Sequence, residues 1–170
     1  TIDLRQIGLQ DFTARSIGEH TAAFSLDVPP QDKQGGAYFD LVMSHSPLLD
    51  PERSSGRVIV NDVPVRSIQL NPDNSERTRH RVSLPATVLR PGVNSVAVTF
   101  NLYAHYAPEC GPLAGERAWA VLHADSGFVL PIGAEQPSLD LQNYPYPFVE
   151  RGTPAGTYLA LPDDRSLLVN

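Results

Sequence analysis

Two short alternating runs meet at a single Asn-Asp dipeptide within residues 54–70, SSGRVIVNDVPVRSIQL. Val58 and Val60 stand at alternate positions before the dipeptide, and Val63 and Val65 do so after it. Such period-two patterning is typical of strands with one buried face. Asn and Asp tolerate the positive φ of a tight hairpin turn, because their short side chains bond locally to the backbone. The stretch therefore predicts a β-hairpin, which is marginal alone in water and needs a larger β structure to pack on.

The rest of the chain supplies further strand-like runs. Sixteen prolines and twelve glycines punctuate the 170 residues, and no long window has helical periodicity. Alternation indicates strands in residues 2–9, 21–28, 37–44, 78–84, 94–102, 117–123 and 127–132. Many short strands joined by turns favour an all-β, two-sheet sandwich over a parallel α/β sheet.

Charge and hydropathy exclude several classes of protein. The net charge is −6 and no basic cluster stands out, which argues against binding nucleic acid or an anionic membrane surface. No apolar run approaches the roughly 18 residues that a membrane span needs. No signal-peptide pattern opens the chain, so we expect any leader to have been removed or the chain to be a fragment. Cys110 is the one cysteine, which excludes an internal disulfide and leaves a free thiol or an outside partner open.

The C-terminal part differs in composition. Residues 136–156 are rich in proline and predict an extended linker. Residues 157–161 form a short apolar run that Pro162 ends, and the following pair of aspartates is suited to cap a helix. A strand followed by a helix cap is typical of the start of an α/β domain.

The order of these motifs resembles a known family. SHSPLLDPERS is followed by the hairpin, then RVSLPATVLRPGVNSVAVTFNL, a Cys-Gly-Pro, AWAVLHADSGFVLP, DLQNYPYPF and TYLALPDD. Together they resemble the periplasmic accessory subunit of bacterial cellulose synthase, in which carbohydrate-binding-like jelly rolls alternate with flavodoxin-like domains. The resemblance implies that residues 1–135 are a galactose-binding-like jelly roll, the second of two. Residues 136–156 would then be its exit linker, and residues 157–170 the first strand of a truncated flavodoxin-like domain.

The resemblance also implies a function. The accessory subunit sits on the synthase at the inner membrane, through an anchor that is absent from this chain, and receives the emerging β-1,4-glucan in the periplasm without catalysing bond formation. The implied partners are the glucan, the catalytic subunit and sister domains, with self-association possible and no nucleic acid. The alternative is a structural docking module without sugar affinity.

Sugar-binding sandwiches stack aromatic rings on pyranose faces and bond the hydroxyls with polar side chains. The candidates here are Tyr103, His105 and Tyr106 in one loop, with Tyr38 and Trp119 behind them. A lone Trp between two alanines on a strand is more often a core residue, so both roles stay open for Trp119. Tyr103 and Tyr106 are equally suited to packing on the sheet edge.

No pattern indicates catalysis, a cofactor or a metal. The sequence lacks a G-x-S-x-G elbow, and the five histidines lack zinc-ligand spacing. Neighbouring strand residues such as His123, Asp125 and Ser126 do not by themselves make a triad. Residues 71–76, NPDNSE, offer oxygen ligands for calcium, although a solvated polar loop is the simpler interpretation.

Overall fold

A computed structural model describes residues 1–29, 36–104, 117–130, 149–150 and 153–154. The chain divides into two units, Thr1–Ala134 and Glu135–Asn170. In the second unit the described residues form an antiparallel pair, β11 (Val149–Glu150) with β12 (Thr153–Pro154). The strands that bear on function belong to the first unit.

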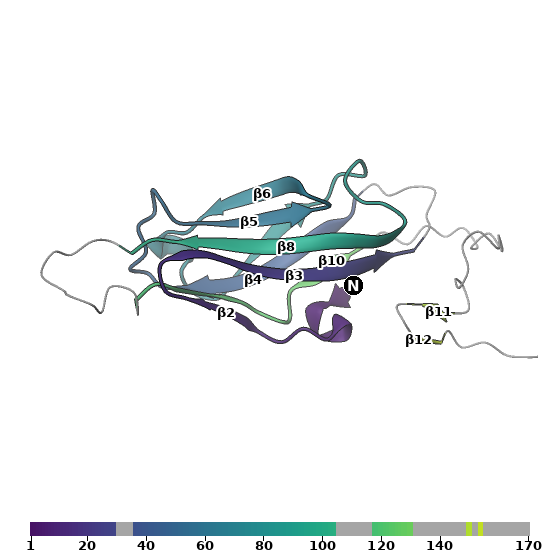
Figure 1. Cartoon of the computed structure of the whole chain (residues 1–170), viewed down its shortest axis with the longest axis horizontal. Helices are drawn as coiled ribbons and strands as arrows, with labels where there is room; N and C mark the ends of the chain where they lie inside the picture. Colours follow the sequence, from purple (N-terminus) through teal and green to yellow (C-terminus); the bar gives the residue numbers. More distant parts are fainter. Residues whose placement is uncertain (30–35, 105–116, 131–148, 151–152, 155–170) are drawn as a thin grey trace, which may run out of the picture. The chain divides into compact units, whose positions relative to one another are not determined.

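The first unit is built almost wholly from strands (Figure 1). Two 3₁₀ turns, η1 (Leu4–Ile7) and η2 (Pro72–Asn74), interrupt them. The strands are β1 (Ile2–Asp3), β2 (Phe12–Arg15), β3 (Gly18–Val28), β4 (Tyr38–His45), β5 (Ser55–Val60), β6 (Val63–Gln69), β7 (Thr78–Ser83), β8 (Gly92–Leu102), β9 (Trp119–Leu122) and β10 (Gly127–Val129).

The strand pairs are nested around one turn. β5 pairs with β6, β4 with β7, β3 with β8, β2 with β9 and β1 with β10, all antiparallel. The first unit is thus one long two-stranded ribbon whose tip is the turn at Asn61 and Asp62. The predicted hairpin is confirmed as the centre of the fold.

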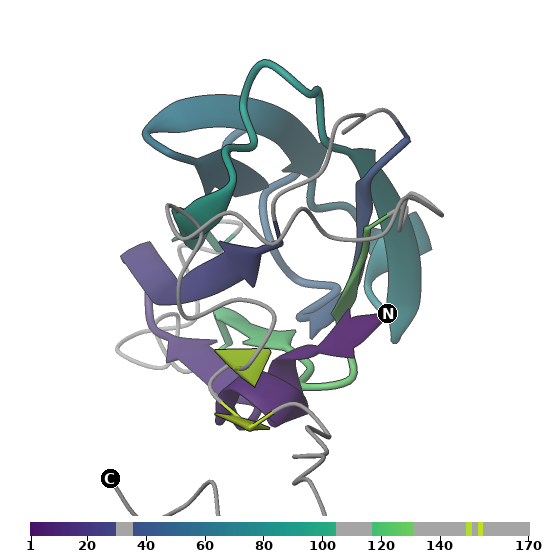
Figure 2. The same ribbon diagram turned by 90° about the vertical axis from the view of Figure 1, so that its right-hand side faces the viewer.

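Rolling up this ribbon produces two sheets. In sheet 1, β4 pairs with β7 and also with β9 and β10. β9 in turn pairs with β2, and β10 pairs with β1. In sheet 2 the order is β3, β8, β5, β6. This is the strand order of a jelly roll, and its two layers are seen from the side in Figure 1 and from one end in Figure 2. The prediction of an all-β jelly-roll sandwich is confirmed.

The central turn has the backbone that its residues favour. Asn61 and Asp62 have φ of 50° and 66°, as a type I′ hairpin turn requires. The Asn61 amide donates to Val88 O and to Asn94 Oδ1, both at 2.8 Å, and its oxygen accepts from Ser95 N at 3.1 Å. The turn is therefore fastened to the start of β8.

The core lies between the sheets and confirms the predicted faces. Val96, Val98, Phe100 and Leu102 of β8 are all buried, and so are Phe39, Leu41 and Met43 of β4. Within this core, the Phe39 ring stacks on the Phe128 ring of β10, with ring centroids 4.3 Å apart. Burial of these apolar surfaces is the main favourable contribution to folding.

The structure corrects the N-terminal part. Residues 2–9 are not one strand, because the chain leaves β1 after two residues and turns through η1 to Gly8, whose φ is +83°. The short strand β2 was not anticipated, since its four residues are too few to show a period.

Candidate functional site

The structure brings two of the five predicted site residues to one end of the sandwich. Tyr103 directly follows β8 and Trp119 begins β9. His105 and Tyr106 lie outside the described residues. Tyr38 begins β4, whose other end approaches Trp119, so it lies about 23 Å away along the strand. Among the described candidates, Tyr38 therefore lies apart from Tyr103 and Trp119.

Trp119 lies on the outer face of sheet 1. Along β9, Ala120 and Leu122 are buried whereas Trp119 and Val121 are only half-buried. Arg15 of β2 is its cross-strand partner on the same face. The interpretation of Trp119 as a core residue is therefore wrong, and its indole has surface available for a ligand.

Tyr103 is held by the loop that follows β4. Its carbonyl accepts from Asp50 N at 2.7 Å and from Ser54 Oγ at 2.9 Å. The Arg53 guanidinium lies over its ring, 4.2 Å from the centroid. One face of the ring is thus covered by a cation, and this contact holds the ring in place.

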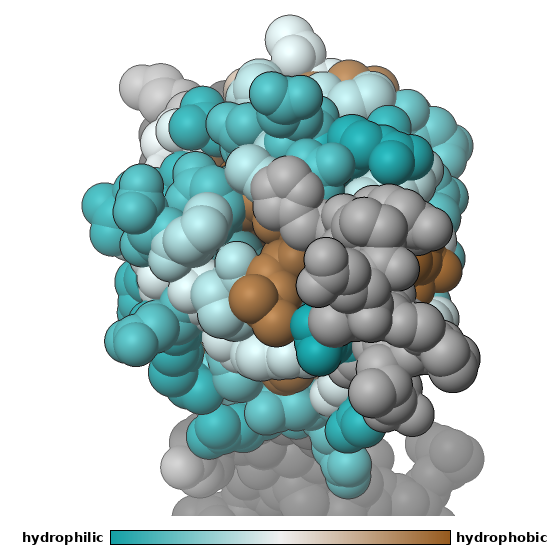
Figure 3. Space-filling model, turned by 90° about the vertical axis from the view of Figure 1, so that its left-hand side faces the viewer, coloured by the Kyte–Doolittle hydropathy of each residue, from teal (hydrophilic) through white to brown (hydrophobic). Residues whose placement is uncertain are grey.

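Apolar side chains are exposed beside these aromatic residues. Ile17 is 47% exposed and directly follows Ser16, whose N–H donates to Ala118 O. Leu48 is 53% exposed and lies two residues after Ser46, whose N–H donates to Trp119 O. We call Ile17, Leu48, Tyr103 and Trp119 the loop end. Figure 3 looks onto this end of the sandwich and shows hydrophobic surface among hydrophilic residues.

A row of arginines occupies the outer face of sheet 1 along β7. Arg79 Nη1 and Arg81 Nε lie 3.4 Å and 3.2 Å from the two oxygens of Asp40. Arg81 also covers the Tyr38 ring, 4.1 Å from its centroid, and Arg77 bonds Asp125 at 2.6 Å. The sequence was interpreted as having no basic cluster; the signal that it did contain is Arg-x-Arg-x-Arg, which alternation places on one face of a strand.

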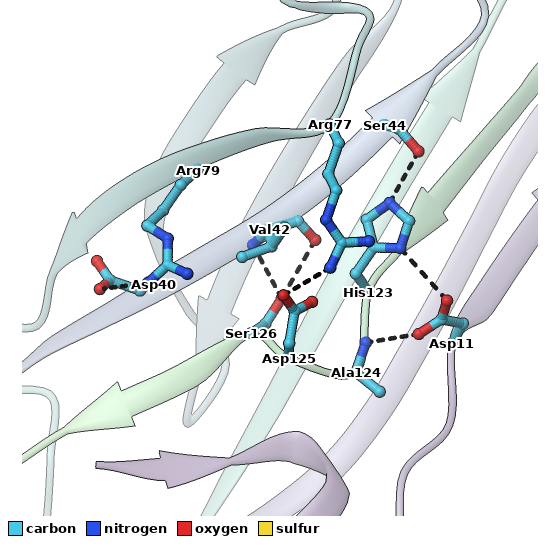
Figure 4. Close-up of polar contacts among 10 residues, drawn as sticks. All are labelled: Asp11, Asp40, Val42, Ser44, Arg77, Arg79, His123, Ala124, Asp125 and Ser126. Atoms are coloured by element: carbon cyan, nitrogen blue, oxygen red, sulfur yellow. Dashed lines mark hydrogen bonds and ion pairs between the residues drawn. The ribbon is translucent and has the colours of Figure 1, made fainter.

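Asp11, His123 and Ser44 form a hydrogen-bonded chain on the same face (Figure 4). His123 Nε2 lies 2.9 Å from Ser44 Oγ, and its Nδ1 lies 3.3 Å from Asp11 Oδ2. The other Asp11 oxygen accepts from Ala124 N at 2.8 Å. That backbone bond lowers the pKa of Asp11 below its ordinary value of 3.8, with help from His123 and against the opposing effect of burial. Sequence offered no signal for this chain, because Asp11 and His123 are 112 residues apart.

This connectivity resembles a Ser-His-Asp triad, yet Ser44 lies in mid-strand. Ser46 N donates to Trp119 O and His123 N to Val42 O, so ladder alternation directs the Ser44 N–H to Val121. Acyl transfer also needs free donors aimed at the developing oxyanion, and this N–H is occupied. The three residues connect the segment before β2 to β4 and to the residue after β9.

Residues 71–76, considered above as a calcium loop, are held together by hydrogen bonds to the side chains of Asn71 and Asn74. Asn71 Oδ1 accepts from the backbone of Asp73 and Asn74, and Asn74 Oδ1 accepts from Asn71 N. His45 Nε2 also lies 2.8 Å from Asn74 Oδ1. In the described part of the chain, no group of three or more His, Cys, Asp or Glu side chains is placed to hold a metal ion. No helix among the described residues is long and apolar enough to cross a membrane.

Comparisons with known proteins give the family of the chain. Residues 1–132 match the family model described as cellulose synthase BcsB, first CBM domain, where CBM denotes a carbohydrate-binding module. The uncharacterized protein YdaN of Bacillus subtilis (strain 168) is 28% identical over 120 residues, which are 70% of this chain and 16% of YdaN. The chain thus spans a small part of that relative.

A solved structure is also similar. It is a family 35 carbohydrate-binding module from an environmental isolate, which matches with 14% identity and a TM-score of 0.41 over 73% of this chain and 74% of that module. The family match confirms the resemblance to the accessory subunit of cellulose synthase. It corrects the order of the modules, because the match is to the first such domain and not to the second.

Proposed function

Residues 1–132 place this chain in the family of the first CBM domain of cellulose synthase BcsB, and from this premise we propose that it is a non-catalytic module that binds the β-1,4-glucan of a cellulose synthase. The observation that carries the proposal is that Trp119 and Tyr103 both lie at the loop end. We assign the glucan contact to this end, with His105 and Tyr106 contributing from the connection between Tyr103 and Trp119.

The chemistry of the loop end suits a glucan. Pyranose rings present C–H groups on their flat faces, which pack on aromatic rings, and hydroxyls at their edges, which need polar partners. The rings of Trp119 and Tyr103 would pack on the flat faces, and the guanidinium groups of Arg15 and Arg53 would donate hydrogen bonds to the hydroxyls. Arg53 also fixes the Tyr103 ring before ligand binds, which lowers the entropic cost of binding.

In the whole protein, this module would help guide the glucan during its export. We place it in the periplasm, as part of a subunit anchored in the inner membrane and assembled with the catalytic subunit. Residues 136–156 would link the jelly roll to a flavodoxin-like domain that starts at residue 157.

The test is a titration of the ¹⁵N-labelled chain with cellohexaose, followed by amide chemical shifts. We expect shifts to cluster on residues flanking Tyr103 and Trp119, and to be lost in Trp119→Ala and in Tyr103→Ala. Tyr38→Ala is the matched control, because it removes an arginine-covered tyrosine from the distant end of β4 and should leave the shifts unchanged. Shifts that are lost in Tyr38→Ala instead would move the site to the opposite end of β4, beside Tyr38.

A second function is favoured by the exposure of Ile17 and Leu48. Exposed apolar side chains beside aromatic residues also suit contact with another domain or subunit. If this end is a docking surface without sugar affinity, cellohexaose at millimolar concentration will give no shifts. Ile17→Ser with Leu48→Ser would then weaken assembly with the synthase while the jelly roll stays folded.

A further inference from the structure

The edge strand β7 combines a backbone edge that no other described strand pairs with and an alternating row of cations. We propose that β7 docks an extended acidic strand of a partner protein, which adds to sheet 1 and places carboxylates opposite Arg79 and Arg81. This surface is separate from the loop end, and the proposal does not depend on glucan binding.

One backbone edge of β7 has no partner strand in the part of the chain that the structure describes. Among the described strands, β7 pairs with β4 alone, and it does so in regular register over all six residues. Leu84 N donates to Ala37 O, so ladder alternation turns the N–H groups of Val82 and His80 toward β4. The N–H and C=O groups of Arg79, Arg81 and Ser83 therefore face the unpaired edge, which is where an added strand forms its hydrogen bonds.

The side chains on the same residues supply positive charge. Arg79 and Arg81 are 61% and 64% exposed, and they share the carboxylate of Asp40, which is itself only 12% exposed. One buried negative charge between two cations leaves an excess of one positive charge, and each guanidinium retains donors beyond its single contact with Asp40. Arg81 is further fixed against Tyr38 at 4.1 Å, so its donors are pre-organised.

The spacing selects the partner. Side chains on one face of a strand repeat at about 6.6 to 6.8 Å, so an extended peptide with Asp or Glu at alternate positions has the same repeat as the arginines. Opposite charges on adjacent strands are stabilising, whereas like charges are destabilising. The arginines therefore disfavour pairing of β7 with β7 of a second copy, which protects the edge from self-association.

The experiment uses the full 170-residue chain, labelled with ¹⁵N, and synthetic peptides. The probe is a peptide of alternating Glu and Thr; a peptide of the same composition with all Glu residues in one block controls for charge alone. We expect the alternating peptide to slow hydrogen exchange at the Arg79, Arg81 and Ser83 amides at least tenfold. His80 and Val82, already bonded to β4, should change much less.

Arg79→Gln with Arg81→Gln should abolish this protection, and adding Asp40→Asn relieves the carboxylate that the double variant leaves without its cations. Arg57→Gln on sheet 2, which removes an exposed ion pair with Glu19, is the matched control and should bind normally. Equal binding of the block peptide, or binding without protection of the edge amides, would overturn strand addition. Protection by a carboxymethylated glucan instead of the peptide would overturn the choice of partner, and no binding by either probe would overturn the site.

Discussion

Asn61 serves both the conformation and the packing of the central turn. Its positive φ is one that Asn tolerates better than most residues, and its side chain forms three hydrogen bonds to the segment from Val88 to Ser95. Asp62 also has positive φ but forms no side-chain hydrogen bond in the described structure, and it is exposed. The two turn residues should therefore respond differently to the same substitution.

Asn61→Gly is expected to destabilise the domain by about 1 to 3 kcal/mol, because glycine keeps the backbone but loses three hydrogen bonds. Asp62→Gly is expected to leave stability unchanged or raise it by up to about 1 kcal/mol, because glycine has no steric cost at positive φ. Urea unfolding of both variants measures the difference. Equal destabilisation would show that the turn conformation alone matters.

His80 should make stability depend on pH. Its Nε2 is buried without a hydrogen-bond partner, and burial, His45 and Arg66 in that order lower its pKa below the ordinary 6.5. The unfolded state therefore binds a proton first as the pH falls. The contribution of neutral His80 to the free energy of unfolding is therefore fully present above pH 6.5. It is lost as the pH falls from 6.5 toward the folded-state pKa of His80.

Urea midpoints measured from pH 7.5 to pH 5 test this expectation. His80→Leu should flatten the decline in this range, because it removes the titrating group. His20→Gln, at an exposed hydrogen bond to Ser16, is the control and should keep the decline. A decline that persists unchanged in His80→Leu would assign it to another group.

At the scale of elements, β9 and β10 form one strand with a break opposite β4. The Val42 N–H meets no backbone carbonyl at this break and donates to Ser126 Oγ at 2.9 Å, while Ser126 Oγ donates to Val42 O at 3.2 Å. Ser126 is fully buried. Its hydroxyl thus takes the place of a peptide group in the ladder.

Ser126→Ala should cost about 1 to 3 kcal/mol, since it leaves the Val42 N–H buried without a partner. Faster hydrogen exchange at the Val42 amide should accompany the loss. Ser25→Ala, at an exposed position of β3, should change stability by less than about 0.5 kcal/mol. Exchange at Val42 that stays at the wild-type rate would mean that another group replaces the hydroxyl.

Sequence predicts elements where alternation is long and one-sided. β8 shows four buried residues at alternate positions, and β4 shows three, so both could be placed with their faces. β6 could be placed as a strand, but its Val63 is 46% exposed because it lies at a sheet edge. β2 and η1 were missed because each has only four residues, too few to show a period. β2 depends on its long-range pairing with β9, and η1 depends on a local capping box at Asp3.

At the scale of the molecule, the nested ribbon decides which site residues meet. Tyr103 and Trp119 flank one connection between β8 and β9, so both lie at the same end of the sandwich, and their joint role in binding a glucan stays a prediction. Tyr38 is distant because β4 runs the length of sheet 1 before it approaches Trp119. The arginine row and the Asp11, His123 and Ser44 chain depend on strand pairing across the sheet, which composition and motif searches do not show.

The central claim is that a glucan stacks at the loop end, and Trp119 can report on this directly. It is the one tryptophan of the chain, so intrinsic fluorescence observes this position alone. Titration with cellohexaose should change the emission of Trp119 saturably in the wild type and in Tyr38→Ala, and much less in Tyr103→Ala. Emission that stays constant up to millimolar cellohexaose would contradict glucan stacking at this end of the jelly roll.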